Sequence, residues 1–82
     1  MPYISQHDRE MLMLGWALPK PKTAGELNYV VTLLIHEYLE NNGNNYQAMN
    51  DILGALDGCS KEFYRRKVAP YEDIKIEQNG DV

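Results

Sequence analysis

The chain lacks the residues that usually stabilise small proteins. Cys59 is the single cysteine among 82 residues, so no internal disulfide can form. Structural zinc normally takes four ligands from Cys and His, whereas only His7 and His36 accompany that cysteine. A chain this short buries a small fraction of its surface, which disulfides, metals or self-association usually compensate. We therefore expect no metal, no cofactor and a homo-oligomer, either a dimer or a larger assembly.

Long apolar runs and an excess of positive charge are also missing. No run approaches the ~20 apolar residues of a membrane span, and no secretory signal is recognisable, which predicts a soluble cytoplasmic protein without membrane contact. Asp and Glu outnumber Lys and Arg by twelve to eight, so nucleic-acid binding would need a concentrated basic patch. No repeat or linker divides the chain, and we interpret residues 1–82 as one small domain.

Capping residues and apolar spacing predict the first two helices. Ser5 marks the start of a short helix over residues 6–17. Thr23, with Glu26 three residues later, forms a capping-box pair and predicts a second helix over residues 24–41. Its inward face is formed by apolar residues three and four positions apart: Leu27, Val30, Val31, Leu34 and Tyr38.

A third helix begins after Asn44 or Asn45, either of which can cap it, and is expected to end at Pro70. Its apolar face consists of Met49, Ile52, Leu53, Leu56, Cys59 and Phe63. The short connection predicts an all-α fold, with an antiparallel hairpin of the second and third helices beside the short N-terminal helix. The tail is expected to be extended, and the alternation of residues 73–77 is compatible with a short strand paired with residues 2–4.

Four motifs occur together along the chain: GELNY, EFYRR, APYED and NGDV. In this combination the chain resembles a family of short phage and prophage proteins of unknown function. The resemblance runs from about residue 25 to the end. It implies an accessory gene of a virus that acts in the host cytoplasm, where non-catalytic proteins that bind host enzymes or sequester host signals are common. It implies no catalytic residue.

Cations and aromatic rings are concentrated towards the end of the predicted third helix. Two glycines four residues apart leave bare backbone on the side away from its apolar face. A partner helix can approach such a strip closely, and a guanidinium beside it can bind a phosphate or carboxylate in bidentate fashion. The candidate binding residues are Gly54, Gly58, Lys61, Tyr64, Arg65, Arg66 and Tyr71, while a contribution from Lys20 and Lys22 is left open.

These cations also have a purely structural interpretation. Basic residues in the last turns of a helix offset the negative end of its macrodipole, by about 0.3 to 1 kcal/mol each. They can also pair with the neighbouring acids Glu62, Glu72 and Asp73.

A second surface lies on the outer side of the second helix and consists of Tyr29, Leu33 and His36. It is either incidentally exposed, covered by the first helix, or a surface for self-association.

Binding without catalysis is the function that these features favour. Cys59 lies on the predicted apolar face without a catalytic partner, and no phosphate-binding loop is recognisable. Asp51 and Asp57 would repel phosphates in the half of the third helix where base contacts occur, so we expect no nucleic-acid binding. We expect a protein that binds and inhibits a host protein. The alternatives are a sponge for a phosphorylated small molecule, such as a nucleotide immune signal, and a small structural or assembly protein.

Overall fold

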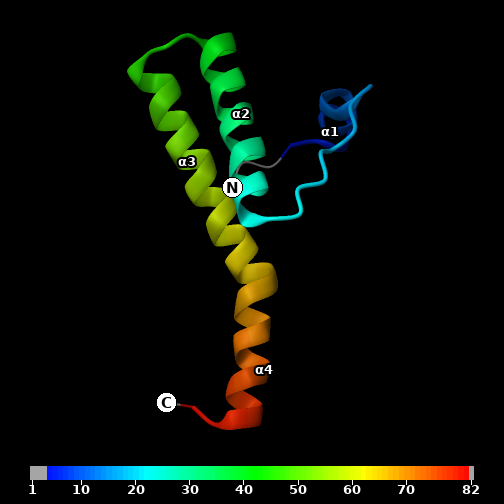
Figure 1. Ribbon diagram of the computed structural model, residues 1–82, viewed down its shortest axis with the longest axis vertical. Helices are drawn as coiled ribbons and strands as arrows, with labels where there is room; N and C mark the ends of the chain where they lie inside the picture. The colour runs from blue at the N-terminus through cyan, green and yellow to red at the C-terminus, as the bar shows by residue number, and fades with distance from the viewer. Residues whose placement is uncertain (1–3, 82) are drawn as a thin grey trace. The chain divides into compact units, whose positions relative to one another are not determined.

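The computed structural model describes residues 4–81, and these residues are helical or in connecting loops, with no strand among them. The elements are α1 (Gln6–Met13), α2 (Ala24–Asn42), α3 (Tyr46–Phe63), the π-helical turn η1 (Tyr64–Val68) and α4 (Ala69–Asn79) (Figure 1). The prediction of an all-α fold is confirmed. The chain divides into two compact units, one ending at Met49 and one beginning at Asn50, within α3.

Side chains cap α2 and α3 as the sequence predicts. Thr23 Oγ1 accepts a hydrogen bond from the Glu26 N–H at 3.1 Å, and Glu26 Oε1 accepts one from the Lys22 N–H at 2.8 Å. At the start of α3, Asn45 Oδ1 accepts from the Ala48 N–H at 2.8 Å, so Asn45 is the cap. These bonds satisfy N–H groups that have no partner inside a helix, which fixes where both helices begin.

The first helix is shorter than predicted. Its start is confirmed, because Ser5 Oγ accepts a hydrogen bond from the Asp8 N–H at 3.1 Å. However, α1 ends at Met13 instead of residue 17. Gly15 has a φ of +78°, a left-handed conformation that the helix cannot include. The glycine therefore ends the helix well before Pro19 and Pro21 are reached.

The covered side of α2 differs from the predicted apolar face. Three residues of that face are exposed, namely Leu27, Leu34 and Tyr38. The half-buried side chains are Val30, Val31, Thr32, Ile35 and Leu39. The covered side is thus rotated about the helix axis towards Ile35 and Leu39. Gly43 follows α2 with a φ of +90°, a backbone conformation that favours glycine, and α2 ends there.

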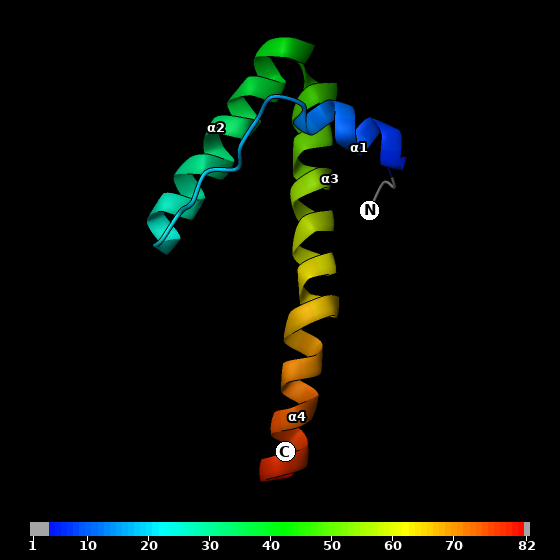
Figure 2. The same cartoon turned by 90° about the vertical axis from the view of Figure 1, so that its right-hand side faces the viewer.

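The helix does not stop at Pro70, contrary to the prediction. A proline inside an α-helix has no N–H to donate, and its ring collides with the carbonyl four residues earlier. Here the turn before the proline is π-helical, and the Ala69 N–H donates to the Tyr64 carbonyl, five residues earlier. This wider turn accommodates the proline, so α3, η1 and α4 form one helical stretch up to Gly80 (Figures 1 and 2).

The extended tail and the short strand predicted for residues 73–77 are likewise wrong, because these residues belong to α4. Their alternating pattern puts Ile74 and Ile76 on different sides of the helix, and both side chains are exposed. The proposed partner strand was residues 2–4, of which residues 2 and 3 lie outside the described part of the chain.

The apolar face predicted for α3 is largely exposed. The exposed side chains include Met49, Leu53, Cys59 and Phe63, whereas Ile52 is half-buried. Cys59 is therefore not the buried thiol that its spacing predicts. The unit that begins at Asn50 contains one continuous helix and no second element, so nothing within that unit can cover its sides. Among residues 4–81, Ala48 has the single buried side chain.

Candidate functional site

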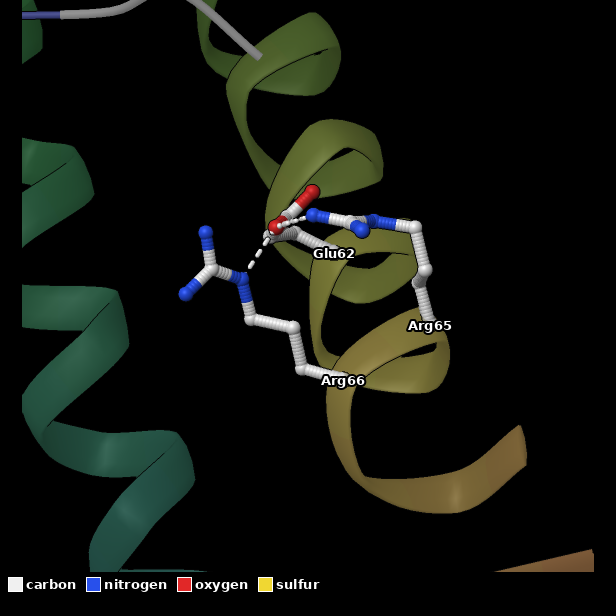
Figure 3. Close-up of polar contacts among 3 residues, drawn as sticks. All are labelled: Glu62, Arg65 and Arg66. Atoms are coloured by element: carbon white, nitrogen blue, oxygen red, sulfur yellow. Dashed lines mark hydrogen bonds and ion pairs between the residues drawn. The ribbon is translucent and has the colours of Figure 1, made fainter. Parts of the chain in front are cut away.

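One carboxylate joins the two arginines of the candidate site. Arg65 Nη2 donates a hydrogen bond to Glu62 Oε1 at 2.6 Å, and Arg66 Nε donates to the same oxygen, so that the two guanidinium groups approach it from different sides (Figure 3). Residues three and four apart are neighbours on a helix surface, which explains the convergence. The arginine side chains remain 66% and 64% exposed, whereas that of Glu62 is 19% exposed. One negative charge is shared by two accessible positive charges.

The stabilising effect of Glu62 is expected to depend on pH. Hydrogen bonds from Arg65 and then Arg66 lower its pKa from 4.5 to about 2. Because the folded-state pKa is lowered, the stabilisation is complete above the unfolded-state value and is lost as pH falls through the folded-state value. We predict that the Tm difference between wild type and Glu62→Gln, measured by circular dichroism, is constant above about pH 5 and vanishes near pH 2. A Glu62 carboxyl that titrates at 4.5 by NMR contradicts this prediction.

Lys61 and the glycines lie on the same helical stretch. Lys61 Nζ lies 2.8 Å from Asp57 Oδ2, one turn earlier, and this hydrogen bond raises the pKa of the lysine. The backbone at Gly54 is open, because an added Cβ would meet no atom within 4 Å. Gly58 is half-buried. The open backbone expected from the sequence is thus present at Gly54.

Both tyrosines of the candidate site interact with charged groups of their own helix. Tyr64 Oη donates to Glu72 Oε2 at 3.0 Å, and this hydrogen bond raises the pKa of the tyrosine. Eight residues of α-helix rotate about 80° beyond two full turns, so the π turn between the two residues is what brings them into line. Lys75 Nζ lies 5.5 Å from the centre of the Tyr71 ring, a cation–π contact. The side chains of Tyr64 and Tyr71 are nevertheless exposed.

The two structural interpretations of the cations have different outcomes. The macrodipole interpretation is wrong, because the helix continues through η1 into α4 and the cations lie in its middle. The pairing interpretation is confirmed for Glu62, whereas Glu72 accepts from Tyr64. The sequence spacing already indicated Glu62 as a partner, but it gave no sign that both arginines would share one of its oxygens.

The surface predicted on the outer side of α2 is open. Tyr29 and Leu33 are 64% and 50% exposed, and His36 is exposed as well. The use of this surface in self-association stays a prediction.

Sequence reasoning missed a hollow of about 380 Å³ near the start of α2. Its lining residues are Pro19, Lys20, Pro21, Gly25, Glu26, Tyr29 and Val30. The signal for it was a lysine between two prolines ahead of a capped helix.

Within residues 4–81, no three side chains from His, Cys, Asp and Glu are grouped closely enough to hold a metal ion. None of the helices in this part of the chain has both the length and the apolar character needed to cross a membrane.

A comparison with known protein families gives a match over the whole chain. A family model described as Domain of unknown function (DUF6899) matches residues 1–82. No curated protein and no solved structure matches the chain.

Proposed function

Since the chain belongs to the family described as Domain of unknown function (DUF6899), we propose a role from its own residues: a non-catalytic, phage-type accessory protein that binds and inhibits a host protein. One observation carries the proposal. Arg65 and Arg66 share a single Glu62 oxygen, so three neighbouring side chains carry a net charge of +1 while both guanidinium groups stay accessible. Exposed guanidinium groups bind carboxylates strongly, because their planar fork of donors matches the carboxylate geometry.

The chemistry of the surface indicates the kind of host surface that fits it. An acidic segment can pair with the arginines, and the open backbone at Gly54 allows a helix to approach closely. Tyr64 and Tyr71 are exposed and offer ring contacts, a residue type that is enriched at protein interfaces. We therefore propose that the host protein presents an acidic helix to this surface.

Affinity capture tests this function. Immobilised wild-type chain is expected to retain one dominant protein from a lysate of the cells in which it is naturally made, and to inhibit that protein once it is purified. Capture is expected to be lost with Arg66→Ala. The matched control is Arg9→Ala, which removes the same charge from α1. Retention of the same protein by both variants, or of none by wild type, contradicts the proposal.

The convergence of the two guanidinium groups also favours a second candidate, a sponge for a phosphorylated small molecule. A phosphate can replace the shared carboxylate, and a nucleotide base can stack on an exposed tyrosine ring. A thermal-shift assay of the purified chain with a panel of nucleotides, run beside the capture experiment, tests this candidate. A ligand at a hundred times its Kd stabilises by about 2.7 kcal/mol. A shift with a nucleotide and no captured protein favours the sponge over the inhibitor.

We also propose how the helices pack and how the chain self-associates. We propose an antiparallel hairpin of α2 and α3 within one domain over residues 1–82. It is supported by the three residues between the end of α2 and the start of α3, because connections this short join antiparallel neighbours. Self-association through Tyr29, Leu33 and His36 is supported by their exposure.

A further inference from the structure

Large apolar side chains follow one side of the helical stretch in the unit that begins at Asn50. We name this set the apolar stripe: Leu53, Leu56, Phe63, Tyr71 and Ile74. Leu53, Phe63 and Tyr71 are 67%, 62% and 60% exposed. A helix normally buries such a stripe against another element, and an isolated helix is marginal in water. The stripe therefore needs a partner from outside this unit.

The π turn is what keeps the stripe continuous between α3 and α4. The Tyr64–Glu72 hydrogen bond of 3.0 Å shows that residues eight positions apart across η1 lie on one side. Phe63 and Tyr71 are also eight apart and span the same turn, so they share a side as well. In a regular α-helix they would be about 80° out of line. One uninterrupted surface therefore runs from α3 to α4, which are continuous in Figure 2.

The length of this surface favours a partner as long as itself. The stripe from Leu53 to Ile74 is about 32 Å long at ~1.5 Å per residue and lies on a helical stretch, Tyr46–Asn79, of about 51 Å, whereas α2 is about 28 Å long. Hence α2 is too short to line the whole stretch. A second copy of the chain has a stretch of the same length and the same stripe. Two copies then form a self-complementary contact, as is usual in two-fold dimers.

The charges beside the stripe determine the direction of the second copy. Glu62 and Arg66 are four residues apart and bridged, so they lie on the same flank. In a symmetric antiparallel pair, each flank of one helix meets the same flank of the other. Glu62 of each copy then faces Arg66 of the other copy, so the pair contains two such contacts. We propose that a second copy of this chain docks antiparallel on the apolar stripe, with Glu62 of each copy beside Arg66 of the other.

The size of the contact fits a stable dimer. Centred between Phe63 and Tyr64, the pair places Leu56 of one copy against Tyr71 of the other. Buried aromatic side chains cover about 150 Å² or more each, and each copy contributes two rings of the stripe. With its three aliphatic side chains and the flanking charged residues, the stripe supplies a large part of the ~800 Å² per partner of a standard interface. Tyr71 belongs to both the stripe and the proposed host-binding surface, and Arg66 borders both, so a dimer and a bound host protein would share these two residues.

Disulfide trapping tests the proposal. In a Cys59→Ser background, Phe63→Cys is expected to form a disulfide-linked dimer under mild oxidation, because the two sulfurs meet at the centre of the pair. The matched control is Lys61→Cys in the same background, which lies on the side away from the stripe. The unmodified Cys59 pair would be separated by about 13 Å along the axes, more than a disulfide spans. Wild type is therefore expected to remain reduced.

Each pattern of cross-linking decides the question. Linkage of Phe63→Cys alone supports the antiparallel dimer. Equal linkage of both engineered cysteines indicates random collision, and strong linkage at native Cys59 indicates a different register, so either result overturns the proposal. Absence of any linkage also overturns it if a Tyr64→Cys variant, one residue from the centre, is equally unreactive. The cross-linking experiment contains no host protein and the capture experiment does not measure dimer formation, so the dimer and the host-binding function are tested separately.

Discussion

Glu62→Arg and Arg66→Glu chains are each expected to be monomeric at concentrations at which their equimolar mixture dimerises. In a dimer of Glu62→Arg, arginine faces arginine at both symmetric contacts, and in a dimer of Arg66→Glu, glutamate faces glutamate. In the mixed dimer both contacts are attractive again. An exposed pair contributes up to about 1 kcal/mol. Two contacts therefore change the dimer Kd by up to roughly thirtyfold. Sedimentation equilibrium of each variant and of the mixture measures this change.

Each single variant loses the Glu62–Arg66 ion pair within one chain as well as the pair between chains. The double variant Glu62→Arg/Arg66→Glu separates these two effects. It restores both kinds of pair, so it is expected to dimerise on its own. Circular dichroism monitors whether each chain keeps its helix. Variants that dimerise alone as well as in the mixture would show that these residues do not face each other, and the antiparallel arrangement would be abandoned.

Pro70→Ala is expected to stabilise the helix while it weakens the dimer. Alanine restores the missing N–H and removes the ring, which gains at most about 3 kcal/mol in a helix interior. Without the proline, η1 is expected to become α-helical and to rotate Tyr71 out of the stripe by about 80°. Removing a large apolar side chain from the contact costs about 1.5 kcal/mol or more per ring. With one ring lost at each end, the dimer Kd rises about a hundredfold.

Two measurements and one control separate this mechanism from general destabilisation. The Tyr64–Glu72 hydrogen bond raises the pKa of Tyr64, so an NMR titration of Pro70→Ala is expected to show that pKa returning to its ordinary value. Glu72→Gln also abolishes the shift, but it leaves the π turn intact and should preserve the dimer. A Pro70→Ala chain that keeps both the shift and the dimer would show that the proline does not hold the turn.

Local signals were the predictable part of the fold. Thr23 and Asn45 act through hydrogen bonds to N–H groups three residues away, so their spacing alone locates the helix starts. The passage of the helix through Pro70 was not predictable from such rules, because a proline is the strongest local stop signal and its accommodation depends on a rare π turn. The alternation of polar and apolar residues over residues 73–77 of α4 is also typical of a strand, which is why the sequence predicted one there.

The candidate site was predictable as a set of residues and less so as an arrangement. Arg65 and Arg66 follow Glu62 at helical spacing, which predicts pairing. Which oxygen accepts and how much of each arginine stays exposed depend on side-chain conformations that spacing does not specify. The exposure of Phe63 differs from the prediction, because helical spacing assigns this apolar residue to a core. Spacing identifies an apolar face, but not whether its cover comes from the same chain.

The mass of the unmodified chain in solution tests the central claim most directly. Static light scattering at micromolar concentration is expected to give twice the 9.4 kDa of one chain, or a whole-number multiple of that dimer mass. A mass of 9.4 kDa at every concentration would contradict the account, since the apolar stripe would then be covered within a single chain or left in water.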